Sequence, residues 1–326
     1  MEEHSTLELT RDTYREYPAI SYSKLSALSQ HPEKVVTEKD FNDGMMTGDI
    51  LDMLMYDGED AFHKKYFVST LDKLPSDTVK AIIDFCNLDF TDENLIKVAR
   101  AANYQARYGD QALLKALRKD NGQEYMNELT MAGSKPIISF TRFAELQQAA
   151  KTLLQHPFSR NHFGDNWQYQ VPVEAEITTS VGEVVKVKGL LDGLNLSQQP
   201  IIINDLKWSS YPLRNFKYNF WKLNYHLQSA LYSYIIQSIH QVDVVFKYVV
   251  YSGYERRPQV FKVPPEILEI GMNGGYVKGW YMKGVRELIN ELLWHQRNDK
   301  WDYPMNVYEY NGEETLQLPD FRHESA

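Results

Sequence analysis

The spacing of apolar residues along the chain is helical as far as about residue 154 and becomes extended from about residue 170. Apolar positions three and four apart predict helices over 21–28, 45–56, 78–86, 93–108, 111–131 and 140–154. Serines at the start of the first segment can cap it, and the His31-Pro32 pair ends it. The N-terminal half is therefore expected to be mostly helical.

Strict alternation of apolar and polar residues begins in the second half of the chain. Residues 170–177 and 184–193 alternate on either side of a turn at Val181-Gly182, which predicts a hairpin. The run 201–208 is apolar enough for a buried central strand. A helix over 224–236, a strand over 244–251 with a hairpin partner over 259–263, and a long helix over 265–296 complete the pattern.

These elements predict an α/β protein whose mixed central β-sheet is flanked by helices and whose chain carries an inserted all-helical region. We expect a flexible N-terminal arm (1–19), N-terminal helices of the core domain (20–69), the helical insert (70–135), the core itself (136–300) and a C-terminal extension (301–326). No catalytic spacing occurs in the insert, which indicates a structural region that packs against the core or a neighbouring subunit.

Composition narrows the class of protein. The single cysteine, Cys86, rules out an intrachain disulfide framework and a zinc knuckle. No apolar stretch approaches the roughly 20 residues of a membrane span, and the chain does not open with a targeting signal, so a soluble, cytoplasmic protein with no membrane partner is expected. The net charge of −9 argues against nucleic acid only superficially. Carboxylates that hold metal can coexist with basic groups confined to one groove.

The candidate chemistry lies on two adjacent predicted strands. Asp192 stands near the end of one strand, and Asp205 and Lys207 are two apart on the next, so their side chains share a face. Two aspartates suit Mg²⁺ or Mn²⁺, which prefer carboxylate oxygens. A lysine beside them can orient or deprotonate a water and offset negative charge. Metal-dependent phosphodiester hydrolysis needs an activated water, neutralisation of the charge on the phosphorus and help for the leaving oxygen, and these residue types can meet those needs.

Three segments of the predicted core resemble a known family. Residues 189–192 (Gly-Leu-Leu-Asp), 203–207 (Ile-Asn-Asp-Leu-Lys) and 225–232 (Tyr-His-Leu-Gln-Ser-Ala-Leu-Tyr) are similar to the motifs of the PD-(D/E)xK nuclease superfamily, in its RecB-like and RecE-like exonuclease branch of phages and bacteria. The resemblance implies a restriction-endonuclease-like core. It also implies that Gln228 and Tyr232 lie on a helix near the site and the DNA.

The resemblance extends to the N-terminal helices. Residues 20–25 with His31-Pro32, and residues 47–52 (Thr-Gly-Asp-Ile-Leu-Asp), are similar to two further motifs of this branch. Many relatives have a metal-binding histidine where this chain has Asp52, so an oxygen ligand replaces it or the position no longer binds. Glu174 or Glu176 resembles an acidic metal ligand that other members contribute.

The family resemblance implies a Mg²⁺-dependent or Mn²⁺-dependent DNA exonuclease of recombination, replication or repair, encoded by a phage or prophage and acting in the host cytoplasm. It further implies double-stranded DNA with free ends as substrate, with a ring-shaped homo-oligomer and a single-strand annealing protein as partners. Two alternatives stay open: a structure-specific endonuclease on the same fold, and a catalytically silent DNA-binding or assembly protein.

Cations and aromatic rings follow the presumed catalytic strand. Phosphates attract the cations, and bases stack on the rings. Each candidate also has a structural alternative. The aromatic rings could serve ordinary packing, Asp205 and Lys207 could form a surface ion pair, and Asp192 could form a turn. Gln228 and Tyr232 could be ordinary helix neighbours, and Asp52 could lie on a solvated helix face. His226 is interpreted as structural. The candidate DNA-binding residues are Lys24, Trp208, Tyr211, Arg214, Lys217 and Lys222.

Overall fold

The computed structural model describes residues 8–37 and 43–313 and divides the chain into two compact units. The first unit comprises Met1–Gly48 with Thr152–Ala326, and the second comprises Asp49–Lys151. The ends of the predicted arm and of the C-terminal extension, 1–7 and 314–326, lie outside the described residues. Within the described part of the chain, none of the helices combines the length and the apolar character needed to cross a membrane.

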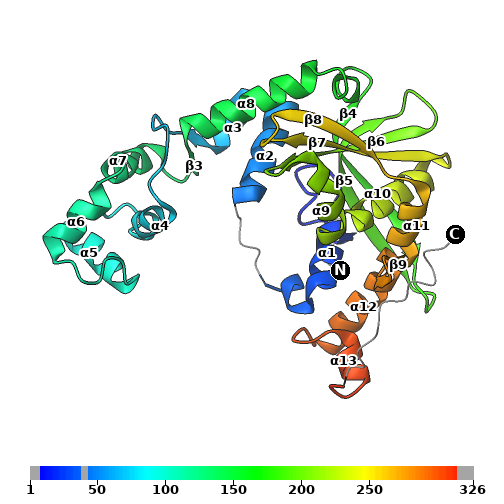
Figure 1. Ribbon diagram of the computed structural model, residues 1–326. Helices are drawn as coiled ribbons and strands as arrows, with labels where there is room; N and C mark the ends of the chain where they lie inside the picture. Colours follow the sequence, from blue (N-terminus) through cyan, green and yellow to red (C-terminus); the bar gives the residue numbers. More distant parts are fainter. Residues whose placement is uncertain (1–7, 38–42, 314–326) are drawn as a thin grey trace, which may run out of the picture. The chain divides into compact units, whose positions relative to one another are not determined.

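A six-stranded mixed sheet organises the first unit (Figure 1). Its order is β1-β5-β6-β7-β8, with β4 also paired to β5. The β1/β5 and β6/β7 pairs are parallel, and the β4/β5, β5/β6 and β7/β8 pairs are antiparallel. The strands are β1 (Ile20–Ser21), β4 (Gln168–Thr178), β5 (Val184–Asn195), β6 (Ile201–Ser209), β7 (Val244–Ser252) and β8 (Arg257–Lys262).

Helix α10 (Tyr225–His240) packs against the sheet and contacts β4, β5 and β7. Leu227, Leu231 and Ile235 are four apart, so they form one stripe of the helix, and each is fully buried. The other helices of this unit are α1 (Tyr22–Gln30), η1 (Pro32–Val35), η2 (Arg160–His162), η3 (Leu213–Asn215), α9 (Phe216–Lys222), α11 (Pro265–Asn273), α12 (Val285–Asn298) and α13 (Met305–Glu309). The predicted α/β class, with a mixed sheet flanked by helices, is confirmed.

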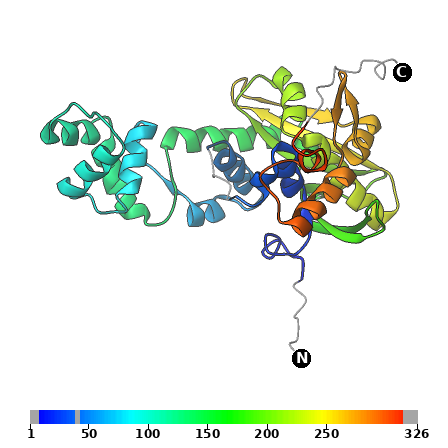
Figure 2. The same cartoon turned by 90° about the horizontal axis from the view of Figure 1, so that it is seen from below.

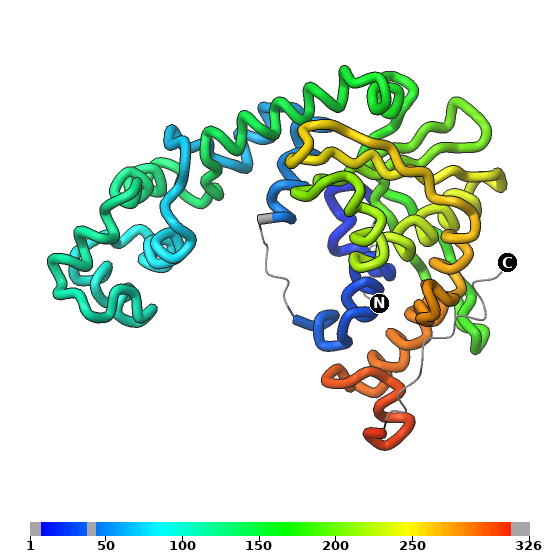
Figure 3. Tube along the Cα trace, viewed as in Figure 1, coloured from blue at the N-terminus to red at the C-terminus, as the bar shows by residue number. Residues whose placement is uncertain are grey.

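The second unit is helical and has its own core, in which Ile83, Leu95 and Leu117 are fully buried. It contains α3 (Glu59–Lys65), α4 (Asp77–Phe85), α5 (Asp92–Ala101), α6 (Asp110–Arg118), α7 (Gly122–Ala132) and the short parallel pair β2 (Phe67–Val68) and β3 (Ile137–Ile138). Helices α2 (Asp43–Tyr56) and α8 (Phe140–Gln155) each include a unit boundary. The tube in Figure 3 follows the chain through these helices.

The single helix predicted over 111–131 is wrong, because the chain forms two helices there. Asp120 and Asn121 adopt φ values of 51° and 72°, which end α6 and start α7. The turn is tight: a Cβ on Gly122 would lie 1.8 Å from the carbonyl oxygen of Leu117. Only glycine fits that approach.

The long helix predicted over 265–296 is also wrong. It is two helices, α11 and α12, separated by the hairpin of β9 (Gly275–Val277) and β10 (Trp280–Met282). Gly274 and Gly279 adopt positive φ values of 83° and 77°, which stop the helix and form the hairpin turn. The end of the predicted flexible arm is held against the sheet, since Tyr17 is buried and donates a hydrogen bond to Glu174 on β4.

Candidate active site

Two strands of the sheet separate at the position of the predicted aspartates. Strands β5 and β6 pair from Asn195↔Ile202 to Gly193↔Asn204 and no further, and the earlier part of β5 pairs with β1 instead. The next residues beyond the last pair are Asp192 and Asp205. The separation of the strands therefore places both carboxylates at a fork in the sheet. Figure 2 gives a second view of the ribbon, turned by 90°.

At this fork the Asp192 carboxylate accepts a main-chain hydrogen bond from the neighbouring strand. The backbone N–H of Leu206 donates to Asp192 Oδ2 at 2.9 Å, and Gln170 Nε2 donates to Oδ1 at 3.4 Å. Burial and repulsion by Asp205 raise the pKa of Asp192 to about 7, although Lys207 and the Leu206 N–H act in the opposite direction. Its charge is therefore poorly compensated in the protein alone.

Asp205 is 2% exposed and held on both sides. Gln228 Nε2 of α10 donates to its Oδ1 at 2.7 Å, and its Oδ2 forms an ion pair with Lys207 Nζ. No hydrogen bond of regular geometry reaches Oδ2 from the described residues. Burial raises the pKa of Asp205, and Lys207 and Gln228 offset part of the increase.

Lys207 lies between the carboxylates and two tyrosine rings. Its Nζ is 5.2 Å from the ring centroid of Tyr225 and 5.9 Å from that of Tyr248. Burial lowers the pKa of Lys207, but electrostatic interactions, foremost with the Asp205 carboxylate and also with Asp192, outweigh it and leave the pKa well above its ordinary value. Lys207 is thus a fixed cation at neutral pH, with 20% of its side chain exposed.

Tyrosines that the sequence did not single out as site residues line the fork. Tyr248 stands beside Asp205 in the β6/β7 register, and its hydroxyl donates to Tyr225 O at 2.8 Å and to Gln228 Oε1 at 3.4 Å. Tyr22 donates to Leu223 O at 2.8 Å, and the charges of Lys207 and Asp205 both act on it. Burial is the main cause that raises the pKa of all three rings, so they stay neutral. Tyr22 and Tyr225 lie inside the motifs quoted above, and this position was the feature of the sequence that could have identified them.

Tyr232, the second residue of the predicted Gln-Tyr pair, packs against β5 rather than contacting the carboxylates through a hydrogen bond in the described structure. It is 6% exposed, hydrogen-bonds with Tyr14, and lies so close to Gly189 that a Cβ there would be 2.8 Å from its Cε1. Asp205 and Asp192 still act on it electrostatically, and burial raises its pKa. Tyr232 therefore belongs to the wall of the site.

Replacing Gly189 by alanine should destabilise the first unit by about 1–3 kcal/mol, because the new methyl group would overlap Tyr232 and touch Val173 at 3.4 Å. Urea unfolding of the variant measures this loss. Gly48→Ala is the matched control, since nothing lies within 4 Å of its added Cβ and its helical position favours alanine. Equal stability of wild type and Gly189→Ala would contradict the close packing.

Glu174 and Glu176, two of the other predicted metal ligands, are not brought to the fork. Glu174 pairs with Lys188 in the β4/β5 register, four residues before Asp192, a separation of about 13 Å at 3.3 Å per residue. Glu174 contacts Tyr17 and Lys186. Glu176, two residues further along β4 and so further from Asp192, is exposed. Asp52 belongs to the second unit, and its role as a ligand stays a prediction. Within the described residues, no three His, Cys, Asp or Glu side chains gather as a metal-binding group.

The predicted DNA-binding residues separate into groups. Trp208 alternates with Lys207 along β6, so it faces the side of the sheet opposite Asp205, where its ring stacks on Tyr251 at 5.5 Å. Tyr211 is 60% exposed. Burial lowers the pKa of Lys188, and the charge of Lys24 on α1 lowers it further.

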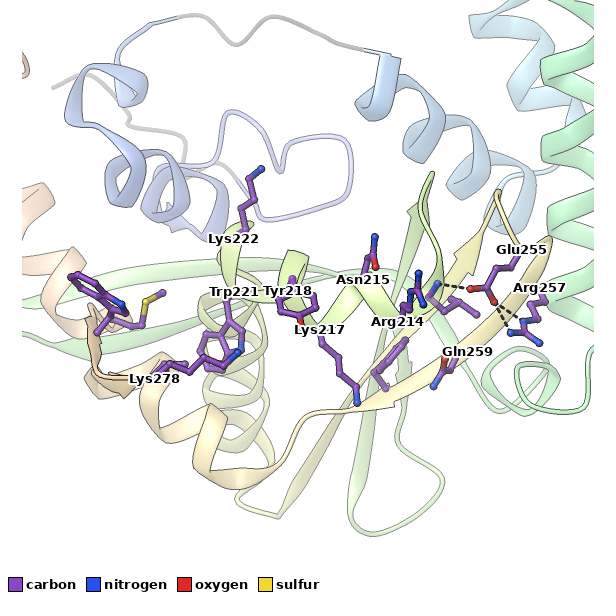
Figure 4. A pocket seen from close by; sticks show the side chains of 15 residues that line it. Arg214, Asn215, Lys217, Tyr218, Trp221, Lys222, Glu255, Arg257, Gln259 and Lys278 are labelled. Atoms are coloured by element: carbon purple, nitrogen blue, oxygen red, sulfur yellow. Dashed lines mark hydrogen bonds and ion pairs between the residues drawn. The ribbon is translucent and has the colours of Figure 1, made fainter. Parts of the chain in front are cut away.

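Arg214, Lys217 and Lys222 line one groove of the first unit (Figure 4). Neither Asp192 nor Asp205 lines it. The groove and the candidate chemistry are therefore distinct.

No family model matches the chain, and no curated protein matches it either. One solved structure, named "Putative exonuclease" from Eubacterium rectale, has a TM-score of 0.44 and 12% identity over 100% of this chain and 99% of its own. Another, named SSO0001, has a TM-score of 0.24 and 13% identity over 72% of this chain and 89% of its own. Neither likeness is close enough to transfer a residue role or an activity.

Proposed function

We propose that this protein is a metal-dependent nuclease that hydrolyses phosphodiester bonds of DNA. The observation that carries the proposal is the placement of Asp192, Asp205 and Lys207 at the fork between β5 and β6. A buried pair of carboxylates with raised pKa values lowers the stability of the fold, so we expect such a pair where it serves a function. The resemblance of the surrounding motifs to PD-(D/E)xK nucleases supports the same reading.

The residues at the fork fit a hard divalent cation. Asp192 and Asp205 offer carboxylate oxygens, and the repulsion that raises the pKa of Asp192 would turn into attraction for a cation between them. Two protein carboxylates with waters in the remaining positions are a usual arrangement for Mg²⁺. When bound there, Mg²⁺ or Mn²⁺ would supply Lewis-acid activation of the phosphate and of water.

The fixed charge of Lys207 decides its part in the reaction. In the metal-free protein the raised pKa of Lys207 keeps its ammonium protonated near neutral pH, which suits a hydrogen-bond donor and a positive charge beside the scissile phosphate. Gln228 holds Asp205 in orientation through Oδ1, and Tyr248 in turn holds Gln228. The tyrosine rings exclude bulk water from this side and strengthen the electrostatic effects.

We infer from the motif resemblance that the substrate is double-stranded DNA attacked at a free end, with Mg²⁺ or Mn²⁺ as cofactor. The experiment incubates purified protein with end-labelled linear duplex and with a covalently closed circle, each with Mg²⁺, with Mn²⁺ or with chelator. Loss of the linear DNA alone, only with metal, is the expected result. Cleavage of the circle would replace the exonuclease by an endonuclease, and no cleavage with either metal would overturn the proposed activity.

A further inference from the structure

The groove beside the fork is built from segments that are far apart in the sequence. Helix η3 and α9 provide one side, β8 with the turn before it another, and the β9–β10 hairpin the end. Its volume is about 1250 Å³. Figure 4 shows the labelled side chains extending from Lys278 and Trp221 to Glu255 and Arg257.

The charge of this groove is opposite in sign to that of the protein. Among the described residues, five cations line it, Arg214, Lys217, Lys222, Arg257 and Lys278, in a chain of net charge −9. The one carboxylate among these lining residues is that of Glu255. Arg257 pairs with it at 2.6 Å, and the backbone N–H of Leu213 donates to it at 3.0 Å, so its charge is largely compensated. Such a local excess of cations attracts a polyanion.

Aromatic rings are exposed among these cations. Tyr218 is 71% exposed and Trp280 is 58% exposed, although both are large enough to favour burial. Lys278 Nζ lies 5.5 Å from the ring centroid of Tyr218. Trp221, one turn after Tyr218 on α9, shares the groove. Flat rings next to cations provide stacking surfaces for bases alongside contacts for phosphates.

We propose that this groove binds single-stranded DNA. The combination of exposed rings and cations favours a single strand over a duplex, because the bases of a duplex are stacked on one another and cannot stack on Tyr218 or Trp280. The groove also adjoins the fork: Lys217, Trp221 and Phe261 line both the groove and a smaller cavity that reaches Tyr248, the neighbour of Asp205. This inference rests on the proposed function in one respect, that the strand held is the one entering or leaving the site.

The test measures binding in chelator, so that no cleavage is required. Anisotropy of a fluorescein-labelled oligothymidine of about 20 nucleotides gives the dissociation constant, and a duplex of the same length is measured in parallel. The double variant Tyr218→Ala/Trp280→Ala should bind the single strand at least about tenfold more weakly, the loss of two stacking contacts. The duplex affinity should change less than about twofold.

A charge variant gives a second readout. Lys217→Gln should reduce the slope of log affinity against log salt by about 0.7, the value for one phosphate contact on a single strand. Tyr303→Ala is the matched control for the rings, since Tyr303 is 55% exposed and lies on a different segment. It should bind as wild type does.

The outcomes separate the groove from the nuclease activity. Unchanged single-strand affinity in the double variant, with metal-dependent cleavage intact in wild type, would overturn the groove and leave the proposed function standing. Loss of single-strand affinity in a protein whose wild type cleaves no DNA would support the groove and overturn the nuclease. Equal loss of single-strand and duplex affinity would overturn the single-strand assignment. The substituted rings are exposed, so unchanged thermal melting is expected.

Discussion

Replacing Asp205 by asparagine is expected to reduce metal-dependent DNA cleavage by about 10²- to 10³-fold, the size of effect that loss of one main electrostatic contributor has in other enzymes. The substitution keeps the shape of the side chain and an oxygen that can accept from Gln228 Nε2. It removes the charge that a cation needs and the partner of Lys207. Initial rates on end-labelled linear duplex, at saturating Mn²⁺, measure the change.

We do not expect this variant to lose activity by unfolding. Burial disfavours the charged form of Asp205, so Asp205→Asn should leave the metal-free protein at least as stable as wild type, apart from the Lys207 charge that loses its nearest partner. Asp243→Asn is the matched control, because Asp243 is exposed at the far end of β7. Cleavage by Asp205→Asn at the wild-type rate would contradict the assignment of Asp205 to the site, and an unfolded variant would contradict the stability prediction.

That Asp205 and Lys207 share one face of β6 was predictable because the strand is regular. Asp205 and Lys207 alternate with Leu206 in an unbroken register with β7 over nine residue pairs, so the period of two holds throughout. The same rule applied to Trp208 assigns it to the opposite face, where it stacks on Tyr251. Proximity in sequence to Lys207 was thus a weaker guide than parity.

The meeting of Asp192 with Asp205 could not be derived from either strand alone. It depends on where the β5/β6 ladder ends. The earlier part of β5 pairs instead with β1, whose two residues lie near the other end of the chain and pair with Val187 and Lys188. Glu174 illustrates the same limit. Its register against Lys188 moves it along the strand from Asp192, which alternation by itself does not fix.

The groove beside the fork was only partly foreseen, and the reason is the C-terminal segment. The helical spacing over 265–296 hid a hairpin that Gly274 and Gly279 create through their positive φ values. That hairpin brings Lys278 and Trp280 to α9, about 60 residues earlier in the chain. Local patterns identified Arg214, Lys217 and Lys222 but not the residues that complete the groove.

Replacing Asp192 by asparagine should stabilise the metal-free protein in a pH-dependent way. Burial and repulsion by Asp205 raise the pKa of Asp192 from 3.8 to about 7 in the folded state, while the unfolded chain keeps the ordinary value. Between about pH 4 and pH 7 the folded protein therefore binds more protons than the unfolded one, and wild type loses stability as the pH rises. Above pH 7 the loss is complete.

The expected difference is largest at alkaline pH. A pKa change from 3.8 to about 7 corresponds to at most about 4 kcal/mol, so Asp192→Asn should exceed wild type by up to this amount at pH 8 and by little at pH 4. Urea unfolding in chelator at the two pH values measures both differences. A pH-independent difference, or a variant less stable than wild type at pH 8, would show that the charge of Asp192 is well compensated without metal.

Added Mn²⁺ gives the same prediction a functional meaning. A cation bound between the carboxylates replaces their repulsion by attraction, so Mn²⁺ should raise the unfolding temperature of wild type at pH 8 and leave that of Asp192→Asn nearly unchanged. Proton and metal then compete for one site, because Asp192 must be ionised to bind the metal. The instability of the bare pair is the physical reason why a metal ion is expected there, and the Asn variant would be the more stable but inactive protein.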